Sequence, residues 1–208
     1  MKLYVASAAL AALLLAAPAA EAGVVTLTFE GLGDQQTIGN WYNGGGGGNY
    51  GITFGSDSLA LVSDADGGTG NFSNNPSGDT VAFFQSGPGD VMDVAAGFTT
   101  GFSFYYAAAV AGFVDVYSGL DGTGTLLAQI NLAATPNPYS VWQETGVAFS
   151  GTAESVIFGG SANYIGFDNI TLGSAVATVP EPGSLMLLGA GLAGLGAVRR
   201  RRKTTKSA

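Results

Sequence analysis

Glycine is the residue that most constrains the fold of this chain. Residues 23–179 hold 29 of the 34 glycines in the 208-residue sequence. This density is far above the usual ~7%, and it disfavours helices because glycine loses more backbone entropy on ordering than any other residue. No part of the stretch shows apolar residues recurring at the helical period of about 3.6. Short runs rich in β-branched and aromatic residues alternate instead with clusters of Gly, Asn, Asp and Pro, a pattern that predicts short strands joined by turns.

The predicted strands are numerous and evenly spread. They cover residues 24–30, 51–54, 58–62, 80–84, 101–106, 113–118, 125–131, 146–150, 155–159 and 164–172. The segment Leu120-Asp121-Gly122-Thr123-Gly124 separates two of them and is typical of a hairpin turn. Many short strands with glycine-rich turns indicate a sandwich or a barrel. We predict an all-β fold, a jelly-roll-like antiparallel β-sandwich, with an immunoglobulin-like sandwich as the alternative.

The last predicted strand carries an irregularity. Ile165 and Phe167 share one face of the strand, whereas Ile170 and Leu172 have the opposite parity. The apolar register therefore changes at Asp168-Asn169, which predicts a β-bulge there.

Charge is distributed unusually along the chain. Residues 23–179 contain no Lys, Arg, His or Cys, and they hold 13 of the 15 acidic residues, which gives this stretch a net charge of −13. Internal salt bridges and disulfides are therefore impossible in it, and each carboxylate must be solvated, hydrogen-bonded or bound to a metal cation. Nucleic acid is excluded as a partner, because binding phosphate requires Lys or Arg, and anionic lipid is disfavoured for the same reason.

The first 22 residues have the layout of a secretory signal peptide. Lys2 forms a basic start, residues 3–17 are an apolar run, and Ala20-Glu21-Ala22 supplies a small-residue cleavage site before Gly23. We expect the mature protein to begin at Gly23.

The other end of the chain has a three-part pattern. Pro180, Glu181 and Pro182 come first, an uncharged stretch covers residues 183–198, and the cluster Arg199, Arg200, Arg201, Arg202 and Lys203 closes it. As a helix, residues 184–198 would span about 22 Å, which is short of the ~30 Å hydrocarbon core of a bilayer. The basic cluster would remain cytoplasmic under the positive-inside rule. The segment is thus either a weak C-terminal membrane anchor or a processing signal, and we favour the second.

This tail, from Val179 to Lys203, resembles the PEP-CTERM sorting signal of exported Gram-negative bacterial proteins. The resemblance implies transient inner-membrane insertion, recognition at Pro180-Glu181-Pro182 by an exosortase-type membrane protease, removal of the helix, and release or transfer to the cell surface or extracellular matrix. In that family the signal accompanies exopolysaccharide and biofilm production. We therefore divide the chain into a signal peptide (1–22), a body domain (23–179), a sorting signal (180–203) and a cytoplasmic tail (204–208).

Segments of the body add a second resemblance. The sequences Thr28-Phe29-Glu30-Gly31-Leu32, Phe102-Ser103-Phe104-Tyr105-Tyr106 and Gly166-Phe167-Asp168-Asn169-Ile170-Thr171-Leu172 are similar to a recurrent body domain of PEP-CTERM proteins. That resemblance implies no particular biochemical activity. More loosely, the strand order resembles that of carbohydrate-binding jelly rolls.

Two acidic residues are candidate metal ligands. In carbohydrate-binding jelly rolls the first and last strands usually lie side by side and often hold a structural Ca²⁺. The likeness implies that Glu30 and Asp168 act as hard oxygen ligands, supplemented by backbone carbonyls. The alternative is that Asp168 caps its own bulge and Glu30 is solvated. A third acidic segment, Asp64-Ala65-Asp66-Gly67, lacks the glycine and glutamate of an EF-hand at Thr69 and Asn75, so we interpret it as an acidic turn rather than a looser calcium loop.

Three aromatic residues are candidate ligand-binding residues. Trp41, Tyr42 and Tyr50 flank the run Gly44–Gly48, which has neither the Lys nor the following helix of a phosphate-binding loop and is predicted to be flexible. These side chains could stack on sugar rings, although the more common place of aromatics in a sandwich is the core.

Catalysis has little support in the composition. Without His, Cys or Lys in the body there is no conventional base, thiolate or Schiff-base lysine, so only a carboxylate pair could act. We predict no catalytic residue. The sequence favours an exported, non-enzymatic surface or matrix protein associated with exopolysaccharide, and the alternatives are a carboxylate-dependent polysaccharide hydrolase or lyase, or a carbohydrate-binding module.

Overall fold

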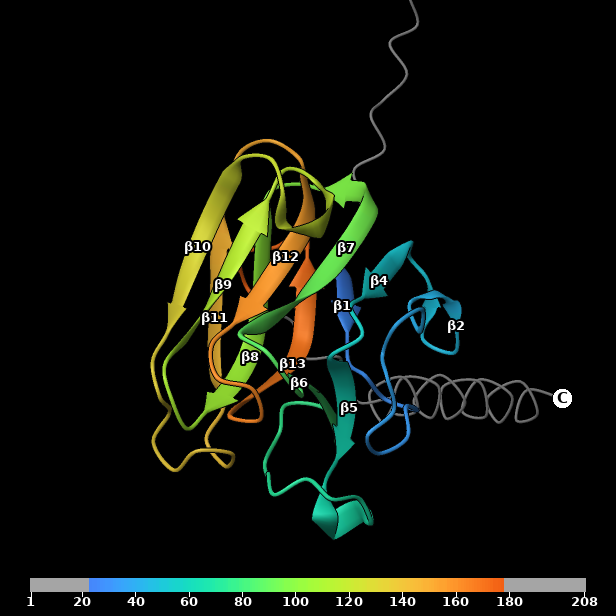
Figure 1. The fold of residues 1–208 in the computed structure, drawn as a ribbon, viewed down its shortest axis with the longest axis vertical. Coiled ribbons are helices and arrows are strands. Elements are labelled where there is room, and N and C mark those ends of the chain that lie inside the picture. Colours follow the sequence, from blue (N-terminus) through green and yellow to red (C-terminus); the bar gives the residue numbers. More distant parts are fainter. Residues whose placement is uncertain (1–22, 178–208) are drawn as a thin grey trace, which may run out of the picture.

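Two antiparallel sheets face each other in residues 23–177, the part of the chain that the computed structural model describes (Figure 1). Sheet I has the order β11 (Gln143–Ala148), β8 (Gly101–Ala108), β13 (Ile165–Leu172), β6 (Thr80–Phe84) and β5 (Ser58–Val62), and β1 (Val25–Leu27) also pairs with β13. Sheet II has the order β10 (Leu126–Leu132), β9 (Gly112–Tyr117), β12 (Ala153–Gly159), β7 (Gly89–Phe98) and β4 (Ile52–Phe54). The predicted all-β, jelly-roll-like sandwich is confirmed.

Aromatic side chains fill the space between the sheets. Phe104 of β8 packs edge-on against Phe167 of β13 with ring centroids 5.7 Å apart, and Phe167 contacts Phe158 of β12 at 4.9 Å. Edge-to-face pairs of this kind contribute about 0.5–1.5 kcal/mol beyond the area they bury. Because residues 23–177 contain no cationic side chain, ion pairs between side chains cannot join the two layers, and this packing holds them together.

The bulge predicted in the last strand is confirmed. The pairing of β13 with β8 shifts register between Asp168 and Thr171, and Asn169 adopts the left-handed conformation with φ of 49°. The extra residue lets Phe167 and Ile170 both reach the core, where each is at most 2% exposed.

Two local predictions are wrong. The strand β7 is absent from the predicted set, because Asp90, Asp93 and the pair Ala95-Ala96 lower its strand propensity, although Met92 and Val94 lie in the core. The run Gly44–Gly48 is predicted to be flexible, whereas it forms a hairpin of β2 (Asn43–Gly45) and β3 (Gly48–Asn49).

The two remaining elements are short turns. The acidic segment is a 3₁₀ turn, η1 (Asp64–Asp66), with Ser63 as its N-cap and Gly67 in the left-handed conformation after it. The predicted hairpin turn contains η2 (Leu120–Gly122) and connects the antiparallel strands β9 and β10.

No helix within residues 23–177 is long and apolar enough to cross a membrane. The predicted signal peptide and the predicted sorting helix lie outside the described residues.

Candidate functional site

Sheet I carries a second apolar layer on its outward face. The cross-strand pairs Leu59–Phe83 and Leu61–Val81 join β5 to β6, and these side chains lie outside the core between the sheets. Val81 is nevertheless only 1% exposed and Phe83 only 8%. Since side chains on the outer face of a sheet are buried only where something covers them, two loops must fold over this part of sheet I.

The covering loops are residues 63–79, between β5 and β6, and residues 133–142, between β10 and β11. The Trp142 indole N–H donates to the carbonyl of Ser73 at 3.1 Å, and the Ser73 amide donates to the carbonyl of Tyr139 at 2.8 Å. The ring of Phe72 meets the Trp142 ring edge-on, with centroids 6.1 Å apart. These contacts fix the two loops to each other, although they are some 70 residues apart in sequence.

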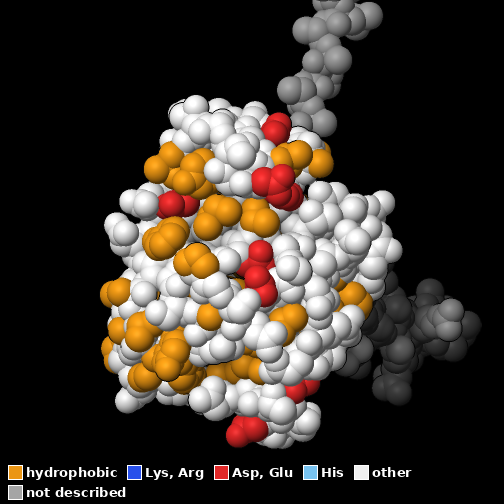
Figure 2. All heavy atoms as spheres, viewed as in Figure 1, with side chains coloured by type: hydrophobic (Ala, Val, Ile, Leu, Met, Phe, Trp, Pro, Cys, Tyr) orange, Lys and Arg blue, Asp and Glu red, His pale blue; other side chains and the backbone are white. Residues whose placement is uncertain are grey.

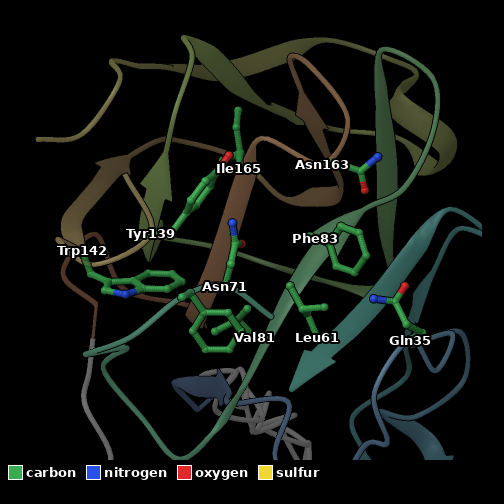
Figure 3. Close-up of a pocket in the computed structure, with 11 residues that line it drawn as sticks. Gln35, Leu61, Asn71, Val81, Phe83, Tyr139, Trp142, Asn163 and Ile165 are labelled. Atoms are coloured by element: carbon green, nitrogen blue, oxygen red, sulfur yellow. The ribbon is translucent and has the colours of Figure 1, made fainter. Parts of the chain in front are cut away.

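The loops enclose a groove rather than a filled layer (Figure 3). Its volume is about 180 Å³. Its lining consists of four aromatic side chains, three amide side chains and an aliphatic floor: Phe72, Phe83, Tyr139, Trp142; Gln35, Asn71, Asn163; Leu61, Val81, Ile165, Gly166. None of these lining residues is charged, so the groove offers ring faces and amide hydrogen-bonding groups but no ionic partner.

Tyr139 is held in the groove wall by an unusual backbone. Its φ is 71°, a left-handed value that is a genuine outlier for a bulky residue and that occurs preferentially at functional sites. Burial, and secondly the proximity of Tyr164, raises the pKa of the Tyr139 hydroxyl above its ordinary value. The hydroxyl therefore remains a neutral group that can donate and accept hydrogen bonds at physiological pH.

The groove rests directly on the backbone of β13 at one glycine. A Cβ added to Gly166 would lie 3.2 Å from the Trp142 ring, so the indole sits against the strand with little space between them. On the rim, the side-chain amide of Asn163 donates to the carbonyl of Gln85 at 3.0 Å, and that of Gln35 donates to Thr69 Oγ1 at 3.2 Å. Both amides are thus oriented by the fold.

A second polar cluster forms where the two predicted metal ligands meet. β1 and β6 follow one another along the same edge of β13, since Phe167 pairs with Ala82 whereas Ile170 pairs with Leu27. The bulge at Asp168 lies at this change of partner. We call the cluster of Glu30, Ser77, Asp79, Asp168 and Asn169 the β1–β6 junction.

Both carboxylates of the junction bind the segment that precedes β6. Asp168, which is 0% exposed, accepts hydrogen bonds from the Ser77 amide at 3.0 Å, from the Ser77 hydroxyl, and from the Asn169 amide at 2.7 Å. Glu30 accepts from the amides of Asp79 at 3.3 Å and Thr80 at 3.2 Å. The adjacency of the first and last strands expected from the sequence is confirmed by the pairing of β1 with β13, whereas the contact of both carboxylates with this segment was not predicted.

Burial dominates the electrostatics of the junction. Burial raises the pKa of Asp168 to about 7. Hydrogen bonds from Ser77 and Asn169 lower this pKa in part, and repulsion from Glu30 adds to the rise. Burial likewise raises the pKa of Glu30 to about 7. Hydrogen bonds from the Asp79 and Thr80 amides lower this pKa in part, and repulsion from the Asp79 carboxylate adds to the rise. No group of three or more acidic, His or Cys side chains positioned to hold a metal occurs within residues 23–177.

Asn169 is the last member of the junction, and one polar atom of its side chain has no hydrogen-bond partner among the described residues. It is fully buried, its Oδ1 accepts from the Ser77 hydroxyl at 2.8 Å, and its Nδ2 has no partner in the described part of the chain. The Ser77 hydroxyl has one proton, which it cannot give to Asp168 and Asn169 together. Turning the Asn169 amide lets Nδ2 donate to Ser77 and Ser77 donate to Asp168, and this leaves Oδ1 as a buried acceptor.

The three aromatic candidates from the sequence do not form a common surface. Tyr42 is 4% exposed and its hydroxyl accepts a hydrogen bond from the Phe29 amide at 2.7 Å, so it is a core residue. Trp41 is partly buried, and Cβ atoms at Gly46 or Gly47 would overlap its ring, which shows that the glycine hairpin lies flat on the indole. Tyr50 is 47% exposed. Only Tyr50 thus retains the accessibility that stacking on a ligand requires.

The aromatic residues that do line a groove are not among the candidates predicted from the sequence. Tyr139 and Trp142 follow Pro136-Asn137-Pro138 in a segment between two predicted strands. Two large aromatic residues in a proline-containing loop, where core packing does not require them, are the signal that could have identified the groove.

Fold and groove together define an antiparallel β-sandwich with an uncharged aromatic groove on one outer face. Residues 178–202 match the PEP-CTERM protein-sorting motif. The chain therefore carries this sorting motif, which marks an exported protein sorted by an exosortase. The comparison with curated proteins finds no match.

Several solved structures are similar to this chain at a low level. One is a glycoside hydrolase family 43 arabinoxylan arabinofuranohydrolase from Bacillus subtilis, with 23% identity, a TM-score of 0.42, and coverage of 59% of this chain and 26% of the hydrolase. CsCBM6-3 from Clostridium stercorarium in complex with cellobiose has 14% identity, a TM-score of 0.40, and coverage of 72% and 93%. A β-1,3-glucan binding CBM6 from Bacillus halodurans has 19% identity, a TM-score of 0.39, and coverage of 57% and 87%. The chain spans about a quarter of the hydrolase, and similarities of this size do not bear on ligand or activity.

Proposed function

We propose that this protein is a non-enzymatic component of the cell surface or extracellular matrix whose body domain binds carbohydrate of an exopolysaccharide in the groove on sheet I. The observation that carries the proposal is the lining of the groove, where four aromatic rings and three amides converge without a charged side chain. The partial burial of the groove, its hydrogen-bonding groups and the absence of charge from its lining all favour carbohydrate as the ligand.

A sugar ring suits this lining because it has apolar C–H faces and a rim of hydroxyl groups. Trp142 and Tyr139 supply ring faces for the first, and Asn71 and Asn163 supply amides that donate and accept for the second. Binding sites for small molecules generally combine a mostly apolar wall with a few polar groups that fix orientation. The groove has this composition, and the two loops that build it are already fixed by the Trp142–Ser73 hydrogen bond.

Contacts near the end of the described residues support processing by an exosortase-type protease at Pro180-Glu181-Pro182. Thr100 Oγ1 donates to the carbonyl of Gly173 at 2.6 Å, and the amide of Ala177 donates to Glu144 at 3.0 Å. Ala177 is itself 7% exposed, and the matched motif begins at the next residue. Cleavage at the motif would therefore leave both of these contacts in place.

A non-catalytic role agrees with the placement of the carboxylates. A glycosidase needs two carboxyl groups facing a substrate, yet no acidic residue lines the groove. The two acids with strongly raised pKa values, Glu30 and Asp168, are bonded to backbone amides of the β1–β6 junction. Their geometry supports a structural role.

As a second proposal, a structural Ca²⁺ binds at the β1–β6 junction through Glu30 and Asp168. Two carboxylates lie there without a cationic side chain, and the turned Asn169 amide would offer its buried oxygen as a third hard ligand. A divalent cation would remove the repulsion between the two acids.

Binding to polysaccharides tests the main proposal. The mature protein should be retarded in affinity electrophoresis through gels containing exopolysaccharide of the native host. Trp142→Ala and Asn71→Ala should abolish or weaken the retardation, whereas Asn131→Ala, which removes an exposed amide from β10 outside the groove, should not. Equal retardation of Trp142→Ala and the unsubstituted protein, with both folded by circular dichroism, would contradict the proposal.

A further inference from the structure

We infer that the groove on sheet I selects uncharged glycans and rejects polysaccharides that carry carboxylate or sulfate groups. This inference rests on the proposed carbohydrate binding and adds the chemical class of the ligand. Three features of the molecule carry it: the groove lining, a carboxylate behind the rim, and the charge of the whole body.

The lining has nothing that compensates an anionic group. A carboxylate that enters a partly apolar site loses hydration, and the loss is tolerated only where a cation or several charge-assisted hydrogen bonds replace the water. The groove offers the neutral amides of Gln35, Asn71 and Asn163 and the neutral hydroxyl of Tyr139. These groups match the hydroxyl and acetamido groups of a neutral sugar.

A carboxylate of the protein lies immediately behind the rim. Gln35 donates to Thr69 Oγ1 at 3.2 Å, and Thr69 Oγ1 donates to Asp34 Oδ2 at 2.8 Å. The other oxygen of Asp34 accepts from the Val62 amide at 3.0 Å. Burial, the largest single influence, raises the pKa of Asp34, but the hydrogen bonds from Thr69 and Val62 together outweigh it, so the pKa is lowered and the negative charge persists next to the groove at neutral pH.

The whole body repels polyanions in addition. Residues 23–179 carry 13 acidic residues and no Lys, Arg or His. Figure 2 shows acidic side chains dispersed over the sheet II face with no basic side chain among them. At an ionic strength of ~0.1 M the field of such charges extends about 10 Å, so it acts on a polymer that passes along the surface.

The test compares polymers that differ only in charge. Exopolysaccharide of the native host and polygalacturonate are each used before and after chemical reduction of their carboxyl groups, with EDTA present to prevent bridging by divalent ions. The reduced, neutral polymers should bind the mature protein, with an affinity that is the same in low and high NaCl. The carboxylated polymers should bind at least tenfold more weakly. A cationic polymer, chitosan, should bind only in low salt, because attraction to the acidic body is screened by salt.

A pair of substitutions ties this selectivity to the groove. Asn71→Lys should weaken binding of the neutral polymer and strengthen binding of polygalacturonate about fivefold, the order of one exposed ion pair. Asn131→Lys changes the net charge equally but lies in β10 outside the groove, and it should change neither affinity.

The outcomes separate the inference from the function on which it rests. If carboxylated polymers bind the unsubstituted protein as tightly as their reduced forms in EDTA, the inference is overturned and carbohydrate binding stands. If Asn131→Lys and Asn71→Lys raise polygalacturonate binding equally, selectivity does not arise in the groove and the inference is likewise overturned. If the folded protein binds none of the polymers, the proposed function fails, and the inference fails with it.

Discussion

The β1–β6 junction predicts an inverted dependence of stability on pH. Burial raises the pKa values of Asp168 and Glu30 to about 7, whereas the corresponding groups of an unfolded chain titrate near 3.8 and 4.5. Between these limits the folded protein binds more protons than the unfolded chain, so stability must decrease as pH rises. The stabilisation is fully present below about pH 4 and is lost as pH rises through about 7, the reverse of the usual behaviour of salt-bridged carboxylates.

The magnitude follows mainly from Asp168. A rise in its pKa from 3.8 to about 7 corresponds to about 4 kcal/mol at roughly 1.4 kcal/mol per pH unit. Glu30 is partly exposed, so solvent screening reduces its contribution, and the repulsion between the two carboxylates is shared rather than counted twice. We therefore expect a loss of about 4 kcal/mol in total, a substantial part of the roughly 5–15 kcal/mol that stabilises an ordinary domain.

Denaturant unfolding of the mature protein in EDTA, at intervals from pH 4.5 to 8, measures most of this loss. The unfolding free energy should decline steadily, and the thermal midpoint should decrease by about 10 °C. Glu30→Gln removes one charge while keeping an acceptor for the Asp79 and Thr80 amides, and it should flatten the decline. Asp64→Asn is the matched control, because it removes one charge from an exposed turn, and it should leave the decline unchanged.

Calcium separates the two interpretations of the junction. If the second proposal is correct, excess Ca²⁺ at pH 8 should restore stability by about 2.7 kcal/mol at a hundredfold excess over its dissociation constant, and Asp168→Ala should abolish this response. Na⁺ at matched ionic strength controls for screening of the body charge. A decline with pH but no response to Ca²⁺ would refute the metal site. Stability that is constant or increases between pH 4.5 and 8 in EDTA would refute the buried-acid account itself.

Three further predictions concern other parts of the chain. Mature protein from the native host should end near Pro180-Glu181-Pro182 and so contain no Lys or Arg, which makes it resistant to trypsin even when unfolded; an intact mass that extends to Ala208 would contradict this. Gly46→Ala should destabilise the fold by about 1–3 kcal/mol in denaturant unfolding, because the new methyl overlaps the Trp41 ring, whereas Gly33→Ala, which meets only an ordinary contact at 3.4 Å, should cost less than about 1 kcal/mol. A reducing-sugar assay should detect no hydrolysis of common polysaccharides; turnover that a single Asp or Glu to Ala change abolishes would contradict the non-catalytic proposal.

Most of the sandwich could be predicted because its strands are locally marked. β6, β8, β9 and β12 are rich in β-branched and aromatic residues, β5 is a short apolar run, and the change of parity in β13 located its bulge. The strand β7 could not be predicted in this way. It adopts an extended conformation because it pairs with both β12 and β4, and these partners outweigh a sequence with two Asp residues.

The β1–β6 junction could be predicted only in part. The adjacency of the first and last strands placed Glu30 near Asp168, and the pairing of β1 with β13 provides the reason. The segment that binds both carboxylates precedes β6, and Ser77 is 91 residues from Asp168 in sequence. No local pattern marks such a partner, since a Ser-Gly-Asp turn occurs in many loops without any carboxylate to bind.

The aromatic residues show most clearly why composition alone did not identify the binding groove. Trp41 and Trp142 both lie against glycine, but the two settings differ in what covers the rest of the ring. The hairpin at Gly46-Gly47 lies flat on Trp41, so that indole serves packing. Trp142 lies against Gly166, donates to Ser73 and also lines the groove, so part of that indole faces the site that we propose to bind carbohydrate. A glycine run next to tryptophan therefore predicts close backbone approach to the ring, whereas availability to a ligand depends on a contact between two loops that are distant in sequence.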